Sequence, residues 1–379
     1  MELLKTLLKG SFLIGIALLA CGSPAALKIK DSLPNCTWLQ GGGDMNRAAY
    51  VELASDSVPR LLWTKRLKTP LLLEPTAALG AMILPTANRR FDIVAASDGA
   101  YLGEVKSGGS LVTPCGLEDS MVAMNEFGQR LRIRNWITKQ VAWQVDLNNM
   151  TLEPLIMSGK IYWFDGDKLL NCYDLKEGKR IWDKRLDNGL SAPLGASASR
   201  MLLTSNKDEL DCISPDSGKA IWSHTVSSRV RNAPVLYDSS VIVSTVDGDI
   251  IKLSAADGNE IWTSDLSAGV FAPLATDGKG IYVGTNDGQL VRLNYETGKV
   301  DWKISTDSPI KAGITVAGNL VVMAGLDHHI YFVDKNQGKT VLDYETKGMI
   351  TARPIVCMNR VYVAGEDKCL YCFKMTKEE

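Results

Sequence analysis

Side chains that often carry chemistry are few in this chain of 379 residues, and four short runs could form a site. Asp327-His328-His329 could bind a metal ion, because imidazole and carboxylate are common ligands. Two Asp-Gly-Asp runs, at 165–167 and 247–249, could bind calcium, which prefers clustered oxygen atoms. Three consecutive glycines at 41–43 could cradle a phosphate group.

Simpler structural roles account for all four runs. Adjacent strand residues point to opposite faces, so His328 and His329 are poorly placed to chelate one ion. Asp-Gly between β-type segments is typical of a tight hairpin turn, where glycine tolerates positive φ. The glycines at 41–43 lack the following lysine and clear helix start of a phosphate loop. We therefore predict polar turns, a lead-in loop over the main domain, no metal site and no cofactor.

Seven cysteines follow residue 21, and their odd number is unusual for an exported protein. Cys369 and Cys372 form a C-x-x-C motif, but a redox motif of this kind requires a helix start and not a strand. We expect small buried thiols. A disulfide between Cys36 and the last repeat is left open, as is a weakly oxidising environment.

The N-terminal segment has the order of a bacterial export signal. Basic residues precede a short apolar stretch at 11–20, which is too short for a stable membrane span. The motif Leu-Leu-Ala-Cys at 18–21 resembles a lipobox, which implies cleavage before Cys21 and its acylation. We predict a signal peptide at 1–20 and a lipidated tether at 21–37; an ordinary signal peptide with an incidental cysteine is the alternative.

Tryptophan marks an internal repeat of about 40 residues. Related positions near Gly103 and Leu342 lack tryptophan but keep the spacing. Proline opens most units, a Gly-Lys-like turn precedes most tryptophans, and short β-branched runs lie between them. Units of four strands and about 40 residues are typical of a propeller. The repeat tryptophans are Trp63, Trp143, Trp182, Trp222, Trp262 and Trp302.

These marks predict an all-β, eight-bladed β-propeller of four-stranded blades. The last unit lacks its fourth strand, whereas the strand at 61–67 has no preceding three, so we expect their pairing to close the ring. The predicted domains are a lead-in segment at 38–58 and a propeller at 59–379. The 42 basic and 43 acidic side chains balance, which argues against nucleic acid as a partner.

The repeat at 287–302, DGQLVRLNYETGKVDW, resembles the eight-bladed repeat of the quinoprotein (PQQ-dehydrogenase-like) family, over residues 59–373. Together with the lipobox, it resembles the BamB family of outer-membrane assembly lipoproteins. That resemblance implies a non-catalytic scaffold, lipid-anchored on the periplasmic face of the outer membrane. The implied partner is the POTRA domains of a BamA-type barrel, with this chain as a monomer within the complex. Glycine at position 22, directly after the cysteine of the lipobox, also resembles the lipoproteins that are sorted to the outer membrane.

Two departures affect the expected partner contacts. The loops at 187–193 and 227–234 are shorter than the partner-binding loops of the BamB family, so no contact residue is carried over. The remaining candidates for a partner-binding rim are four cations, with a merely solvated surface as the alternative: Arg229, Arg231, Lys311 and Arg353.

Two other functions remain open. One is a propeller that binds a quinone-like or other small ligand in its central channel. The quinoprotein dehydrogenases use a vicinal Cys-Cys pair, which is absent from this sequence. The other is a structural lipoprotein of a different envelope complex.

Overall fold

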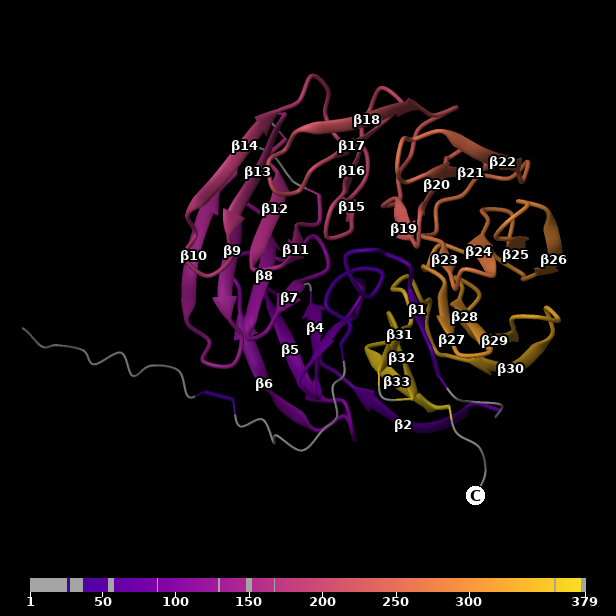
Figure 1. The fold of residues 1–379 in the computed structure, drawn as a ribbon. Coiled ribbons are helices and arrows are strands. Elements are labelled where there is room, and N and C mark those ends of the chain that lie inside the picture. Colours follow the sequence, from indigo (N-terminus) through magenta and orange to yellow (C-terminus); the bar gives the residue numbers. More distant parts are fainter. Residues whose placement is uncertain are drawn as a thin grey trace, which may run out of the picture.

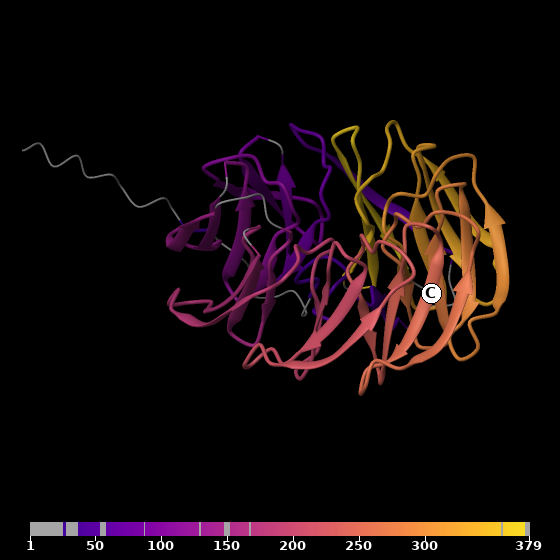
Figure 2. The ribbon, with the colours of Figure 1, turned by 90° about the horizontal axis from the view of Figure 1, so that it is seen from above.

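The computed structural model describes residues 26–27, 37–53, 58–86, 88–128, 130–147, 152–166, 168–357 and 359–375. Within these residues the chain forms eight β-sheets arranged as blades around a ring, as predicted (Figure 1). At 90° to that view, the blades stand side by side around the ring (Figure 2). The described part contains no helix with the length and apolar character needed to cross a bilayer. The predicted signal peptide and Cys21 lie outside the described residues.

The first four blades follow the chain order, each from its inner to its outer strand. Blade 1 consists of β3 (Thr76–Ala78), β4 (Ala81–Thr86), β5 (Arg90–Ala95) and β6 (Tyr101–Lys106). Blade 2 consists of β7 (Gly116–Glu118), β8 (Met121–Glu126), β9 (Arg130–Asn135) and β10 (Val141–Asp146). Blade 3 consists of β11 (Leu155–Met157), β12 (Lys160–Phe164), β13 (Leu169–Asp174) and β14 (Arg180–Arg185). Blade 4 consists of β15 (Gly195–Ala196), β16 (Met201–Thr204), β17 (Glu209–Ile213) and β18 (Ala220–Thr225).

The remaining blades have the same order, except that the last one is completed from the other end of the chain. Blade 5 consists of β19 (Val235–Tyr237), β20 (Ser240–Ser244), β21 (Asp249–Ser254) and β22 (Glu260–Asp265). Blade 6 consists of β23 (Ala275–Thr276), β24 (Gly280–Gly284), β25 (Gln289–Asn294) and β26 (Val300–Ser305). Blade 7 consists of β27 (Thr315–Ala317), β28 (Leu320–Ala324), β29 (His329–Asp334) and β30 (Thr340–Glu345). Blade 8 consists of β31 (Ile355–Cys357), β32 (Arg360–Ala364), β33 (Cys369–Lys374) and β2 (Arg60–Arg66).

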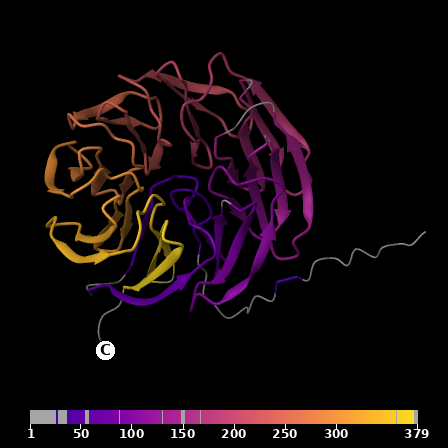
Figure 3. The same cartoon turned by 180° about the vertical axis from the view of Figure 1, so that it is seen from behind.

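The outer strand of blade 8 comes from the beginning of the propeller. β2 pairs antiparallel with β33, with Trp63 opposite Cys372. In Figure 3 this indigo strand lies beside the yellow strands of blade 8. The first and last strands of the ring therefore share one sheet.

Each repeat tryptophan joins its blade to the next one. Trp143 of β10 packs on Gly178, where a Cβ would lie 2.6 Å from the indole, and its Nε1–H donates to the Leu175 carbonyl at 2.8 Å. Gly178 has a φ of 67°, which the turn requires and which glycine adopts without strain. This contact explains why tryptophan and the turn glycine repeat together. Glycines in the next blade receive the other five: Trp63, Trp182, Trp222, Trp262 and Trp302.

The lead-in segment lies inside the ring instead of passing over it (Figures 1 and 3). At one equivalent residue in each of seven blades, the inner-strand N–H donates to an oxygen of this segment at 2.7–3.2 Å. Strand β1 (Tyr50–Val51) then pairs parallel with β27. Unpaired inner edges would otherwise leave these N–H groups unsatisfied. The donors are Ala77, Leu117, Ile156, Ala196, Leu236, Thr276 and Val316.

Candidate functional site

One repeat position places charged side chains at the centre of the ring. In blades 1 to 7 it lies three residues before the N–H donor that holds the lead-in segment, and in five of these blades it is proline, alanine or glycine. Arg353 has the equivalent position in blade 8. The charged exceptions are Glu74 in blade 1, Glu153 in blade 3 and Arg353 in blade 8. All three line one central cavity of about 200 Å³, together with Arg47 of the lead-in segment.

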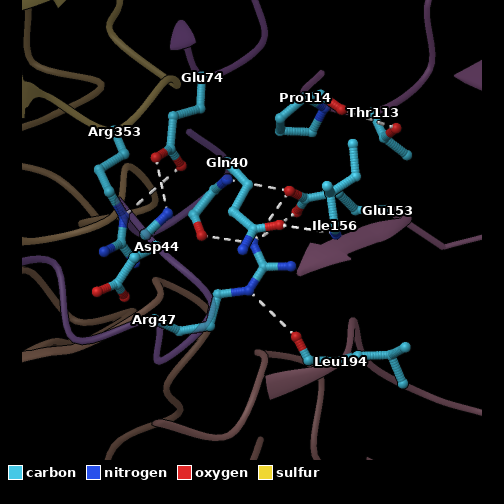
Figure 4. A network of polar contacts seen from close by, with 12 residues as sticks. Gln40, Asp44, Arg47, Glu74, Thr113, Pro114, Glu153, Ile156, Leu194 and Arg353 are labelled. Carbon is cyan, nitrogen blue, oxygen red and sulfur yellow. Dashed lines mark hydrogen bonds and ion pairs between the residues drawn. The ribbon is translucent and has the colours of Figure 1, made fainter. Parts of the chain in front are cut away.

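Arg47 and Glu153 form a buried ion pair between the lead-in segment and blade 3 (Figure 4). Their side chains are 4% and 7% exposed, and Arg47 Nη1 lies 3.0 Å from Oε1 and 3.1 Å from Oε2. Arg47 also donates from Nε to the Leu194 carbonyl at 3.1 Å and from Nη1 to the Gly41 carbonyl. The Gly41 N–H donates to Glu153 at 3.0 Å. These bonds fix the fold of the glycine-rich loop, where a Cβ on Gly41 would collide with both charged groups.

Glu74 and Arg353 form a second, longer pair, with Nε and Oε2 3.7 Å apart. Glu74 accepts hydrogen bonds from Trp38 Nε1 at 2.7 Å and from the Gly42 N–H at 2.8 Å. Burial raises the pKa of Glu74 and lowers that of Arg353, while each partner's charge opposes the shift. A Cβ on Gly313 would overlap the Arg353 guanidinium, which explains why this blade has glycine in place of proline.

The cavity leaves some hydrogen-bond donors unused. Arg47 Nη2 and Arg353 Nη1 are buried and have no hydrogen-bond partner among the described residues. Arg231 and Asn232 also line the cavity, on the side of blade 5. The centre of the ring is therefore polar, and the lead-in segment runs through it.

These residues do not fit the quinone and calcium that the quinoprotein fold family implies. The two carboxylates of the cavity are already bonded, Glu74 to Trp38 and Gly42, and Glu153 to Arg47 and Gly41. Across the described residues, no group of three or more acidic, histidine or cysteine side chains could hold a metal ion. We therefore derive no chemistry through such a cofactor.

The predicted basic rim is wrong for Arg353 and stays a prediction for the other three residues. Arg353 is 4% exposed because it turns into the central cavity and faces Glu74. Arg229, Arg231 and Lys311 are exposed on the loops that lead into the inner strands of blades 5 and 7. The Arg231 guanidinium lies 5.8 Å from the ring centre of Phe271, which is 38% exposed on the intervening loop.

The aspartate–glycine and histidine runs lie at hairpin turns. Gly248 has a φ of 116°, and the Asp249 N–H donates to Thr245 Oγ1 at 3.0 Å. His328 has a φ of 71° and takes the turn position in blade 7. His329 Nδ1 lies 2.5 Å from Asp343 Oδ1, and this contact raises the pKa of His329. Asp167 of the other run lies outside the described residues.

The cysteines of the described residues are buried and mostly free. Cys369 and Cys372 are both free thiols on β33, and burial raises the pKa of each. A raised pKa suppresses the thiolate, which is the opposite of what a redox motif needs. Cys357 is disulfide-bonded. Cys36, which the sequence allows to bond to this blade, lies outside the described residues. The other free thiols are Cys115, Cys172 and Cys212.

The sequence contained an unused signal for the central cluster. In three blades a charged residue directly precedes the repeat proline: Glu74-Pro75, Glu153-Pro154 and Arg353-Pro354. In the four other blades that have this proline, threonine or alanine precedes it. Arg47 carried no such mark, because the repeat does not extend into the lead-in segment.

Comparisons with known proteins agree with this architecture. The family model described as outer membrane protein assembly factor BamB matches residues 166–269 and 247–349. The structure of BamB from Moraxella catarrhalis superimposes with a TM-score of 0.73 at 18% identity, covering 85% of this chain and 99% of that one. The quinohemoprotein alcohol dehydrogenase from Comamonas testosteroni has a TM-score of 0.77 at 13% identity, covering 93% and 82%. No curated protein sequence matches significantly. At these identities, the structural likeness concerns the fold.

Proposed function

Because the chain is a BamB-like propeller built from PQQ-type repeats, we propose that it is a non-catalytic scaffold for outer-membrane β-barrel assembly. It is anchored by lipid on Cys21 at the periplasmic face of the outer membrane. Its partner is the POTRA domains of a BamA-type barrel, which it binds as a monomer within the complex. Fold alone does not select a function, so the proposal depends on how this ring is built.

The lead-in segment at the centre of the ring carries the proposal. Resemblance to the quinoprotein enzymes implies a ligand bound in the central channel of the ring. Here the chain's own lead-in segment bonds to seven inner strands and leaves a space of about 200 Å³. The residues of two buried ion pairs, Arg47–Glu153 and Arg353–Glu74, line this space. Because its own chain occupies the centre, the ring offers its outer surfaces, and above all its loops, to a partner.

The loops around Phe271 form the surface that we propose for partner binding. Arg229, Arg231 and Lys311 are exposed there, and within the described residues none of the three forms an ion pair. Arg231 lies against Phe271, so a flat aromatic group and a cation are presented together. Aromatic and arginine side chains are enriched among residues that dominate binding energy.

The strand topology supplies a matched control on the other face. The Val246 N–H donates to the Arg229 carbonyl, so the loops before the inner strands lie beside the turns between the second and third strands. The turns between the third and fourth strands lie at the opposite ends of the same strands. Three exposed lysines occupy equivalent positions in those turns: Lys219, Lys299 and Lys339.

The test compares two triple charge reversals in binding to a purified BamA-type POTRA fragment. Changing Arg229, Arg231 and Lys311 to Glu should weaken binding at least tenfold, because it replaces the three cations of the proposed contact surface with carboxylates. The triple change of Lys219, Lys299 and Lys339 to Glu, with the same change in net charge, should leave it within about twofold. Equal affinity for both variants would reject this surface. A wild-type chain that does not bind the fragment would reject the proposed partner.

A further inference from the structure

The outer edge between blades 1 and 2 holds a residue from outside the repeats. Blade 1 has Gly103 where six other blades place tryptophan, as the pairing of Gly103 with Ile93 shows. The turn that would receive that indole, in blade 2, has Lys139 with a φ of 64° where other blades have glycine. The loss of one tryptophan and its glycine leaves a notch between the two blades.

Leu27 fills this notch. Its side chain is 8% exposed and joins the apolar cluster that spans blades 1 and 2, which includes Ile93 and Trp136. A Cβ added to Gly103 would lie 2.6 Å from Leu27 Cδ2, so the leucine occupies the space above the glycine. Residues 26–27 lie outside the ring beside β6 (Figure 1).

Leu27 also replaces the hydrogen bond of the missing indole. In blade 2, Trp143 donates to the carbonyl of Leu175, which lies three residues before the turn glycine of blade 3. At the notch, the Leu27 N–H donates to the Ile137 carbonyl at 2.9 Å, two residues before Lys139. Trp63 uses the corresponding carbonyl of Ser97, two residues before Gly99, at 3.3 Å. Leu27 thus supplies both the packing and the hydrogen bond that a repeat tryptophan supplies at other blade junctions.

The short chain distance between Leu27 and Cys21 limits how far a lipid on Cys21 can lie from the notch. Cys21 lies six residues earlier, and six residues span at most about 20 Å when fully extended. An acyl chain on Cys21 therefore cannot reach a bilayer that is far from the notch. The opposite edge, at blades 5 and 6, has no such restraint.

We propose that Leu27 takes the place of the missing tryptophan and holds the blade 1–blade 2 edge of the propeller toward the lipid surface. This rests on the proposed lipidation of Cys21. The ring then stands on its edge near the membrane, and the loops around Phe271 remain accessible from the side.

The orientation can be read by energy transfer from two matched positions. Val141 opens β10 in blade 2 and is 44% exposed, whereas Val300 opens β26 in blade 6 and is 51% exposed. The two blades lie across the ring from each other. The lipidated full-length chain, with a fluorescent amino acid at one or the other position, is placed in phosphatidylethanolamine–phosphatidylglycerol vesicles that carry an acceptor on a small fraction of headgroups.

Transfer from position 141 should exceed transfer from position 300 several-fold. Leu27→Asp should remove the difference, because a carboxylate does not enter the apolar notch, while Ala26→Asp, at the exposed neighbour, should keep it. Equal transfer from both positions in vesicle-bound wild-type protein would overturn the orientation. Protein that does not float with vesicles would overturn the lipidation and, with it, the orientation.

The docking of Leu27 is tested separately without lipid. In the Cys21→Ser chain, hydrogen exchange at the amide of residue 27 should be slow. Adding Leu27→Asp to this chain should accelerate exchange at that amide at least tenfold relative to adding Ala26→Asp. An unprotected Leu27 amide in a folded Cys21→Ser chain would overturn the docking, whatever the membrane result.

Discussion

Replacing Arg47 by Met should destabilise the whole ring, because this side chain connects the lead-in segment to two blades. The change removes the bonds to Glu153 and to the Leu194 carbonyl and leaves the Glu153 carboxylate 7% exposed without its cation. Breaking a buried pair in this way costs about 3–5 kcal/mol. At about 2 °C per kcal/mol for a large domain, the melting temperature should fall by roughly 6–10 °C.

Calorimetry on the full chain measures this effect, with Arg180→Met as the control. Arg180 forms an ion pair with Asp183 at 3.0 Å, but it is 61% exposed, so its loss should cost about 0–1 kcal/mol. The double variant Arg47→Met/Glu153→Met should be more stable than Arg47→Met, because no unpaired charge remains in the cavity. A melting temperature of Arg47→Met within 1 °C of the wild type would show that the lead-in segment does not hold the ring together.

Three further predictions follow from single contacts. Gly313→Ala should cost about 1–3 kcal/mol by pushing Arg353 aside, and adding Arg353→Ala should relieve the collision; a stability equal to wild type would show that the guanidinium has room. Asp343→Asn should lower the pKa of His329 in an NMR titration, because the contact with Asp343 raises this pKa; an unchanged titration would contradict the contact. The stabilisation from this pair is fully present below the unfolded pKa of about 6.5 and is lost as pH rises through the raised pKa of the folded state. Alkylation at pH 8 should leave the buried thiols unmodified until denaturant is added, because burial raises the pKa of Cys115 and Cys372 to about 12 and that of Cys172 and Cys212 to about 11. Cys357 should need a reductant as well, since it is disulfide-bonded. Rapid labelling of the native protein would contradict the burial of the free thiols.

The blades could be predicted from the sequence because their contacts are local and repeat. Trp143 and Gly178 mark one blade junction, and the same pair recurs at a fixed spacing along the chain. The two losses of tryptophan could be located but not explained. At Leu342 the next blade has no turn to receive an indole, because its outer strand β2 comes from the other end of the chain. At Gly103 the space is taken by Leu27.

The central site could not be predicted, because it depends on a segment outside the repeat. Nothing in the spacing shows that residues 38–51 pass through the ring and meet seven inner strands. Without that path, Arg353 reads as one of several surface cations, and Glu74 and Glu153 read as solvated residues beside a proline. The charged residue before the repeat proline was the one available sign, and it has meaning only once Arg47 is placed opposite Glu153.

The most direct test of the scaffold proposal is cross-linked affinity purification of the lipidated chain from its own membranes, read by mass spectrometry. We expect a BamA-type barrel to be enriched, with cross-links from its POTRA domains to Lys311 and its neighbouring loops and few to Lys219, Lys299 or Lys339. Reproducible recovery of a different complex without such a barrel would contradict the assembly role and would leave only the fold.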